Sequence, residues 1–233
     1  MNLVTFSGPP SSGKTAVILK TINALKERDI NVGVVKFDCL YTDDDELYAK
    51  EGIPVKKGLS GSLCPDHYFV SNIEEVVQWG RKKDLDMLIT ESAGLCNRCS
   101  PYINEIKAIC VIDNLSGINT PRKIGPMLKR ADMVVITKGD IVSQAEREVF
   151  ASRVSDVNPS ALVMHINGLT GQGAYEFSTF LYDEEEDIET VTGRKLRFSM
   201  PSAMCSYCLG ETRIGDEHQL GNVKKIELGD DND

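Results

Sequence analysis

The chain has 233 residues, 41% of them hydrophobic, and a formal net charge of −9. That length and apolar content predict one sizeable core, arranged as one domain with an extension. The acidic balance argues against nucleic acid as a partner, because phosphate backbones need clustered Lys and Arg. No apolar run is long enough for a membrane span, and the first residues enter a strand-like run directly, so we expect a cytoplasmic protein with no membrane partner.

The first strand-like run, NLVTF, leads into GPPSSGKT and then into a helical pattern. Gly8, Gly13, Lys14 and Thr15 have the spacing of the phosphate-binding loop, whose backbone N–H groups turn toward phosphates at a helix N-terminus. Lys14 is expected to reach the β- and γ-phosphates, and Thr15 to ligate Mg²⁺. The sequence therefore predicts a nucleoside triphosphate site that includes Gly8, Ser11, Ser12, Gly13, Lys14 and Thr15.

Further strand-like runs alternate with helical segments at the spacing of βαβ units: NVGVVKF, LDMLIT, KAICVID, DMVVIT and ALVMHI. Their nearly continuous apolar character predicts an α/β fold with a mostly parallel sheet and helices on both faces, as in P-loop NTPases. Two helix starts carry the capping-box pattern, Ser71 with Glu74 and Ser143 with Glu146.

Two acidic positions follow strand-like runs at the predicted phosphate edge. Asp38 comes directly after NVGVVKF and is placed to join a Mg²⁺ shell or to orient the attacking water. In LITESAG, Glu91 can approach Mg²⁺, and the N–H of Gly94 can face the γ-phosphate. We therefore expect catalysis by positioning and electrostatics, with Lys14, Asp38, Glu91 and Gly94 as its residues.

A base-recognition motif follows the run DMVVI. In TKGD, Asp140 can accept hydrogen bonds from the ring N–H and exocyclic amine of guanine, which favours GTP over ATP. Thr137 stands where such motifs more commonly carry Asn, and Lys138 follows it. The loop NGLTGQG comes after the next strand, and its first residues, Asn167, Gly168 and Leu169, can wrap the edge of the base.

The character of the sequence changes at residue 183, where DEEEDIE places six acids in seven residues. We interpret this run as a solvated linker, which divides the chain into a P-loop domain over residues 1–182 and an extension over residues 183–233. Within the extension, KLRFSMP and VKKIEL are candidates for a small hairpin that brackets Cys205 and Cys208.

Seven cysteines are many for a cytosolic chain, in which paired cysteines usually hold metal or do redox work. Cys110 lies in an apolar run and is expected in the core. The remaining candidates include two Cys-x-x-Cys pairs and one Cys-His pair: Cys96 with Cys99, Cys205 with Cys208, and Cys64 with His67.

These thiols leave several interpretations open. They can ligate zinc, copper(I) or an iron–sulfur cluster, they can form a thiol–disulfide redox pair, or they can be inert. The Cys-His pair can serve metal transfer or sensing, or belong to a polar switch loop. The two Cys-x-x-Cys pairs can join within one chain, or Cys96 and Cys99 can meet their copies across a dimer axis.

Taken together, these motifs resemble the SIMIBI-class metallochaperone GTPases, above all the urease accessory G protein and the hydrogenase nickel-incorporation GTPase. The resemblance covers residues 1–182 through GPPSSGKT, DCLYTDDDEL, CPDH, ESAG, SPYI, VIDNLSGINTPRKIGP and TKGD. It implies a GTPase that dimerises with nucleotide and passes a metal, nickel or zinc among the candidates, to a client metalloenzyme or its accessory proteins. It also implies nucleotide-site roles for Lys14, Thr15, Asp38, Glu91 and Asp140.

Three departures from the urease protein's pattern stand out. Its Cys-Pro-His motif is interrupted here by Asp66, its Glu four residues before that Cys is Ser60, and Cys205 and Cys208 lie on an extension that it lacks. Two further hypotheses therefore stand beside the GTPase metallochaperone. One is a dimeric NTPase with a bridging iron–sulfur cluster, serving electron transfer or corrinoid reactivation. The other is a metal- or redox-sensing nucleotide-binding module with negligible turnover.

Overall fold

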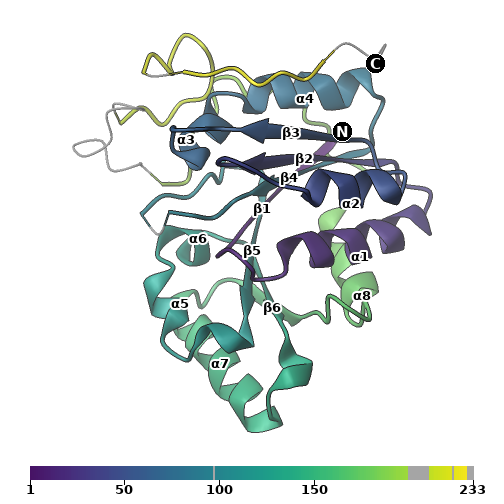
Figure 1. Ribbon diagram of the computed structural model, residues 1–233, viewed down its shortest axis with the longest axis vertical. Coiled ribbons are helices and arrows are strands. Elements are labelled where there is room, and N and C mark those ends of the chain that lie inside the picture. Colours follow the sequence, from purple (N-terminus) through teal and green to yellow (C-terminus); the bar gives the residue numbers. More distant parts are fainter. Residues whose placement is uncertain (97, 199–209, 222, 230–233) are drawn as a thin grey trace.

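The computed structural model describes residues 1–96, 98–198, 210–221 and 223–229. Seven parallel strands form one sheet in the order β3-β2-β4-β1-β5-β6-β7 (Figure 1). The strands are β1 (Asn2–Ser7), β2 (Val32–Asp38), β3 (Val55–Leu59), β4 (Met87–Ser92), β5 (Lys107–Asp113), β6 (Met133–Thr137) and β7 (Leu162–His165). The helices are α1 (Lys14–Lys26), α2 (Asp44–Lys50), α3 (Pro65–Val70), α4 (Ile73–Lys82), α5 (Thr120–Lys123), α6 (Pro126–Lys129), α7 (Gln144–Val157) and α8 (Ala174–Leu181), with short 3-10 turns η1 (Asn114–Ser116) and η2 (Gly139–Ile141).

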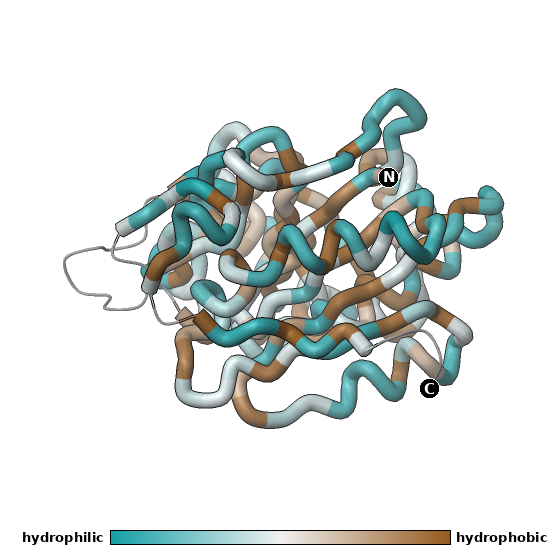
Figure 2. Tube along the Cα trace, turned by 90° about the horizontal axis from the view of Figure 1, so that it is seen from above, coloured by the Kyte–Doolittle hydropathy of each residue, from teal (hydrophilic) through white to brown (hydrophobic). Residues whose placement is uncertain are grey.

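Helices cover both faces of the sheet, as predicted. Alternate residues of each strand point to opposite faces, so β1 buries Val4 and Phe6 against α1 and α8 on one side and Leu3 against α3 and α4 on the other. The rings of Phe6 and Phe177 meet edge to face with centroids 6.1 Å apart. In Figure 2, brown apolar stretches run through the middle of the molecule, and teal polar stretches follow the outer helices and loops.

The strands predicted for the P-loop domain all form, and β3 is an additional one. Its sequence, VKKGL, lacks a continuous apolar run because it lies at the edge of the sheet, where Lys57 is exposed and pairs with Asp45 at 2.8 Å. None of the helices in the described part of the chain combines the length and the apolar character needed to cross a bilayer.

One predicted capping box forms and the other does not. Ser143 and Glu146 cap α7 reciprocally. At α4, however, the N-cap is Asn72, which makes no side-chain cap bond. The Ser71 hydroxyl donates instead to the His67 carbonyl at 3.0 Å, while Glu74 Oε2 accepts from the backbone N–H groups of Val191 and Thr192 at 2.8 and 3.0 Å. The second prediction was wrong because Glu74 fastens the C-terminal extension.

The extension packs on the α3–α4 face, where its path crosses the upper part of Figure 1. It adds five buried side chains to the core cluster of that face: Ile188, Val191, Leu196, Ile214 and Ile226. The acidic run is thus not a purely solvated linker, since Ile188 within it is only 5% exposed.

The described parts of the extension form two isolated antiparallel bridges, Ile103 with Leu196 and Lys195 with Arg213, and residues 223–228 form no strand. The expected hairpin between KLRFSMP and VKKIEL is therefore absent from the described residues. Its second half lies along α3 and α4 instead, because Asn72 donates to the Lys224 carbonyl at 2.8 Å and accepts from the Ile226 N–H at 2.8 Å.

Candidate functional site

The phosphate-binding loop connects the central strand β1 to α1, at the carboxyl edge of the sheet. Gly8 has φ 148°, and a Cβ there would lie 2.0 Å from the Val111 carbonyl oxygen, so the loop needs glycine at this position. Gly94 has φ 68°, and a Cβ there would lie 1.7 Å from the Gly8 carbonyl oxygen. The ESAG segment therefore lies directly against the phosphate-binding loop, as its predicted role requires.

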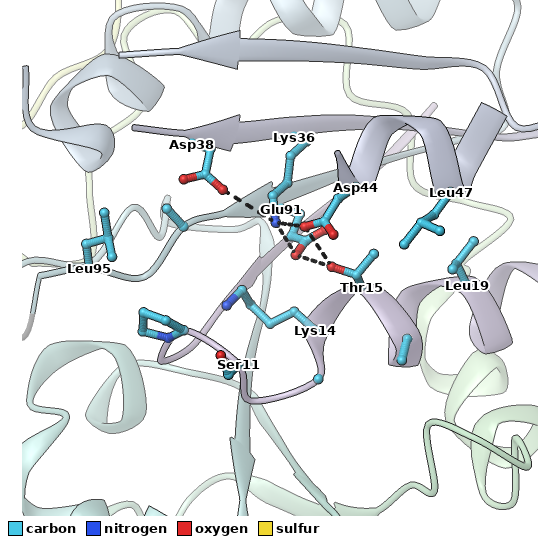
Figure 3. A pocket seen from close by; sticks show the side chains of 14 residues that line it. Ser11, Lys14, Thr15, Leu19, Lys36, Asp38, Asp44, Leu47, Glu91 and Leu95 are labelled. Atoms are coloured by element: carbon cyan, nitrogen blue, oxygen red, sulfur yellow. Dashed lines mark hydrogen bonds and ion pairs between the residues drawn. The ribbon is translucent and has the colours of Figure 1, made fainter. Parts of the chain in front are cut away.

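A cavity of about 500 Å³ opens beside this loop (Figure 3). Lys14 Nζ donates to the carbonyl oxygens of Gly8 and Pro9, both at 3.0 Å, and burial lowers the pKa of Lys14. The Ser12 hydroxyl is buried without a hydrogen-bond partner among the described residues. An unpaired hydroxyl and a buried ammonium that donates to two carbonyls suit an anionic ligand such as a phosphate chain.

Acidic side chains gather on the other side of the cavity. Glu91, fully buried, accepts from Thr15 Oγ1 at 2.9 Å and from Lys36 Nζ at 2.6 Å with one oxygen, and from the Tyr48 hydroxyl at 2.7 Å with the other. Asp44, at the start of α2, lies 3.1 Å from Thr15 Oγ1 and 2.6 Å from Lys36 Nζ. Figure 3 shows these groups converging from β2, β4, α1 and α2.

Asp38 stands at the rim of this group. Its Oδ2 lies 3.9 Å from Lys36 Nζ, and its Oδ1 accepts from the Cys39 N–H at 2.8 Å. Hydroxyl and carboxylate oxygens are the donors that Mg²⁺ prefers. The set of Thr15, Asp38, Asp44 and Glu91 fits that ion by its chemistry, since it already surrounds a cationic group.

The TKGD segment contacts the phosphate-binding loop through two side-chain hydrogen bonds to its backbone. Thr137 Oγ1 donates to the Ser12 carbonyl at 2.6 Å, and Lys138 Nζ donates to the Ser11 carbonyl at 2.7 Å. A Cβ on Gly13 would lie 3.6 Å from the Thr137 side chain. Thr137, in place of the commoner Asn, therefore has a positioning contact of its own.

Asp140 and Asn167 line a second cavity, of about 340 Å³. Asn167 Oδ1 accepts from the N–H groups of Leu169 and Thr170 at 2.9 and 3.1 Å, which shapes the NGLTGQG loop, and Leu169 is 80% exposed. A Cβ on Gly168 would lie 3.0 Å from the Ala16 Cβ. Both predicted base-binding segments thus lie next to the start of α1.

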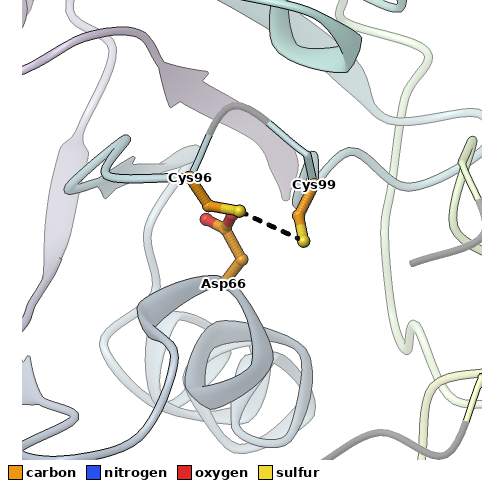
Figure 4. Close-up of side chains that lie close together, drawn as sticks. All are labelled: Asp66, Cys96 and Cys99. Atoms are coloured by element: carbon orange, nitrogen blue, oxygen red, sulfur yellow. Dashed lines mark hydrogen bonds between the residues drawn. The ribbon is translucent and has the colours of Figure 1, made fainter. Parts of the chain in front are cut away.

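A cluster of soft and hard donors lies beyond the ESAG segment, on the α3 side of the sheet. Donor atoms of Asp66, Cys96 and Cys99 all lie within 4.8 Å of one another (Figure 4), and the two sulfurs are 3.5 Å apart. Asp66 Oδ1 accepts from the Ser92 hydroxyl at 3.2 Å, whereas its buried Oδ2 has no hydrogen-bond partner among the described residues. Two thiols and an unpaired carboxylate oxygen fit a transition metal such as zinc.

The environment shifts the titration of this cluster. A hydrogen bond with Cys99 lowers the pKa of Cys64 to about 6, and the same contact raises the pKa of Cys99. Burial, followed by the negative Cys64, raises the pKa of Asp66 to about 7. Cys110 is fully buried in β5, as predicted, and burial raises the pKa of its thiol to about 12.

Of the predicted cysteine ligands, Cys96 and Cys99 belong to the donor cluster, and Cys64 lies next to it through its hydrogen bond with Cys99. His67, in α3, is fully buried with its Nε2 3.5 Å from the Ser71 hydroxyl, and it does not belong to the donor cluster of the described residues. Cys205 and Cys208 fall outside the described residues.

Sequence reasoning missed four residues at these sites: Lys36, Asp44, Tyr48 and Asp66. Lys36 gave a usable signal, because a lone Lys inside the apolar run NVGVVKF must be paired with acids if it is buried. Asp44 lies in a run of acids, from which the sequence does not single it out. Asp66 interrupts a Cys-Pro-His motif, and that pattern does not indicate a metal donor.

The fold and the phosphate-binding loop together define a P-loop nucleotide-binding protein of the α/β class. Residues 2–165 match the family model "CobW/HypB/UreG, nucleotide-binding domain", and the chain belongs to that family. An uncharacterised protein of Methanocaldococcus jannaschii is 48% identical over 227 residues, which are 97% of each chain.

Solved structures of two hydrogenase maturation factors have the same fold as this chain. The hydrogenase maturation factor HypB of Archaeoglobus fulgidus has a TM-score of 0.62 at 22% identity, covering 78% of this chain and 88% of its own. HypB of Helicobacter pylori in complex with nickel has a TM-score of 0.62 at 20% identity, covering 81% and 92%. These likenesses confirm the predicted fold class.

Proposed function

We propose that the chain is a GTP-hydrolysing, metallochaperone-like protein that couples its nucleotide state to delivery of a metal or metal cofactor to a client metalloenzyme or its accessory proteins. The observation that carries this proposal is the short path between the two sites. Glu91 lies in the acidic group of the nucleotide cavity, Gly94 lies against Gly8, Leu95 lines the cavity, and Cys96 belongs to the donor cluster.

The end of β4 adds a second connection. Adjacent strand residues point to opposite faces of a sheet. Glu91 therefore faces Thr15 on the α1 side, and Ser92 donates to Asp66 on the α3 side. Any movement of this strand end that follows from nucleotide binding also moves a hydrogen bond of a metal-donor residue.

The nucleotide part of the proposal rests on the arrangement of the loops. Asp140 and Asn167 share one cavity, which supports guanine as the base. Lys14 neutralises phosphate charge, Asp38 orients the attacking water and Gly94 contacts the γ-phosphate, with Thr15, Asp38, Asp44 and Glu91 as the residues that hold Mg²⁺. When bound, Mg²⁺ supplies charge neutralisation on the phosphates.

The metal part rests on the donor cluster. The cluster provides two thiols and a carboxylate, and Cys64, in contact with Cys99, offers a third thiol. These donors favour zinc or nickel as the transferred ion and leave an iron–sulfur cluster as the alternative. A homodimer that forms with GTP is supported by exposed apolar side chains in the loop between Asp38 and Asp44, two residues that line the nucleotide cavity: Leu40 is 74% exposed and Tyr41 is 72% exposed. We place this activity in the cytoplasm, where free thiols persist.

The test is anaerobic purification followed by metal and sulfide analysis, with turnover of GTP and ATP measured on the same sample. We expect GTP hydrolysis that Lys14→Ala abolishes, and one bound transition metal per cysteine cluster that Cys96→Ala removes. A Lys14→Ala variant with normal turnover would show that this loop is not the hydrolytic site. Labile sulfide with visible absorbance would redirect the proposal to the iron–sulfur reading.

A further inference from the structure

Lys36 is a buried ammonium in the middle of β2. The side chain enters the same face as α1, and only 4% of the residue is exposed. Its Nζ lies 2.6 Å from Glu91 Oε1, 2.6 Å from Asp44 Oδ2 and 3.9 Å from Asp38 Oδ2. Burial opposes the charged form, but Glu91 and Asp44 outweigh that cost, and the pKa of Lys36 is raised. A buried charge is tolerated only when it is paired in this way.

The register of β2 and β4 positions Lys36 directly beside Glu91. Lys36 and Glu91 are direct partners across the parallel pair β2–β4, so their side chains leave the sheet side by side on the same face. Asp44 reaches the same point from α2, and Tyr48 of α2 holds the second oxygen of Glu91. The ammonium is thus held by groups on two other elements, β4 and α2, and not by one flexible contact.

The partners of Lys36 are the oxygens that a magnesium ion would use. Thr15 Oγ1 contacts the same two carboxylates, at 2.9 Å from Glu91 Oε1 and 3.1 Å from Asp44 Oδ2. Mg²⁺ requires oxygens at about 2.0–2.1 Å in near-octahedral geometry. An ammonium that occupies the same oxygens would both block these positions and repel a second cation.

We propose that Lys36 is a tethered cation that holds the magnesium position in the nucleotide-free protein and leaves Asp44 and Glu91 when the Mg²⁺–nucleotide complex binds. This inference rests on the proposed function for the presence of that complex. Asp38, whose Oδ2 lies 3.9 Å from Lys36 Nζ, can pair with the displaced ammonium, and in that state Thr15, Asp44 and Glu91 are the residues that hold Mg²⁺.

The arrangement has a specific consequence for metal selectivity. Free Mg²⁺ must displace an ion pair without gaining phosphate ligands, whereas the Mg²⁺–nucleotide complex gains contacts to the phosphate-binding loop. The acidic group of the nucleotide-free protein therefore binds free divalent ions weakly, and its affinity for them rises when nucleotide is bound. Lys36 is a positioning and selectivity residue in this scheme.

The test uses Mn²⁺ as a spectroscopic probe, because it prefers the same oxygen donors and not thiolates. Binding of Mn²⁺ to the nucleotide-free, chelator-treated full chain is followed by electron paramagnetic resonance. We expect Lys36→Met to bind Mn²⁺ at least tenfold more tightly than wild type. The matched control is Lys57→Met, which removes an exposed lysine of the neighbouring strand β3 from its ion pair with Asp45 of α2 and should stay within twofold of wild type.

Equal Mn²⁺ affinities of Lys36→Met and Lys57→Met would overturn the proposal. Nucleotide binding is measured separately with a fluorescent GDP analogue. If wild type binds no nucleotide, the proposed function fails, while the difference in Mn²⁺ affinity still tests the role of Lys36. The two failures are therefore distinguishable.

A measurement on wild type covers the case in which Lys36→Met does not fold. In protein labelled with ¹⁵N-lysine, the buried Nζ of Lys36 is expected to exchange slowly and to give its own ammonium signal. We expect millimolar Mg²⁺ alone to leave this signal in place, and Mg²⁺ with GDP to shift it. A signal that responds to Mg²⁺ alone, or that stays unchanged with Mg²⁺ and GDP, contradicts the displacement of Lys36.

Discussion

At Asp140, a single carboxylate is proposed to decide the base. It lines the cavity of about 340 Å³ together with Asn167. Asp140→Asn replaces a charged, bidentate acceptor, and we expect it to weaken GTP binding by about 1.5–3 kcal/mol. Calorimetric titration with GTP and ATP measures this change. Asp156→Asn, an exposed carboxylate on α7, is the control, and equal affinities of wild type for GTP and ATP would show that Asp140 does not select guanine.

Asp66 makes the metal-free protein sensitive to pH. Its pKa is raised from the ordinary 3.8 to about 7, so the folded state disfavours the ionised carboxylate. Because the folded state binds this proton more tightly than the unfolded state, Asp66 does not lower the free energy of unfolding well below pH 4. The free energy of unfolding falls as the pH rises toward 7 and remains lower above pH 7. At about 1.36 kcal/mol per pKa unit, the loss at pH 8 amounts to about 4 kcal/mol at most.

We therefore expect Asp66→Asn to be more stable than wild type at pH 8 and to lose this advantage as the pH falls to 5. Urea unfolding in the presence of a chelator measures the difference across that range. Saturating Zn²⁺ should make wild type more stable than Asp66→Asn at pH 8, because the carboxylate of Asp66 is a strong zinc ligand and the amide of Asn is not. A difference that does not change with pH would mean that Asp66 is not the titrating group.

At the scale of elements, the C-terminal segment fastens α3, the helix that carries Asp66. Ile226 lies against Gly58 of β3 and Tyr68 of α3: a Cβ on Gly58 would lie 2.7 Å from Ile226 Cδ1 and 2.9 Å from the Tyr68 ring. Lys224 Nζ donates to the Leu59 carbonyl at 2.6 Å and lies 5.8 Å from the centroid of the Tyr68 ring. We propose that residues 183–233 form an extension, of which the described parts pack against the nucleotide-binding domain of residues 1–182.

Ile226→Ala is expected to lower the free energy of unfolding by about 2 kcal/mol, at the low end for a buried Ile, because Ile226 retains 9% exposure. Urea unfolding measures the loss. Leu220→Ala, in the same extension but 77% exposed, should change stability by less than about 0.5 kcal/mol. Similar losses in the two variants would mean that the segment is not docked through Ile226.

The elements also show what local patterns can and cannot predict. Apolar runs such as KAICVID identify buried parallel strands directly, and the spacing of Gly8, Gly13 and Lys14 identifies the phosphate-binding loop. Glu74 has the same local pattern as Glu146, yet it binds backbone more than a hundred residues away. A capping pattern cannot reveal a distant competitor for the same carboxylate.

The candidate sites also combine residues that local patterns reveal with residues that they do not reveal. Lys36 meets Glu91 because β2 and β4 are register partners, and Asp66 meets Cys96 because α3 packs beneath the loop after β4. Both contacts depend on sheet order and helix packing, which single-sequence patterns do not contain. Residues placed within one motif were therefore predictable, and residues that complete a site from another element were not.

At the scale of the whole molecule, the central claim is that nucleotide and metal sites are coupled through residues 91–96. Coupling is reciprocal, so nucleotide must change metal affinity by the same factor by which metal changes nucleotide affinity. We propose that the exposed Leu40 and Tyr41 contact a second chain in the GTP state, which would gather metal ligands from both chains and release them after hydrolysis.

The most direct measurement is the Zn²⁺ affinity of the protein, determined by competition with a chromogenic chelator. It is measured once with a non-hydrolysable GTP analogue and Mg²⁺ and once with GDP. We predict affinities that differ at least tenfold in wild type and in Cys110→Ala, whose thiol lies in the core, and no high-affinity binding in Cys96→Ala. Wild-type affinities that agree within twofold would correspond to a coupling free energy of only about 0.4 kcal/mol, too small to drive delivery, and would contradict the metallochaperone proposal.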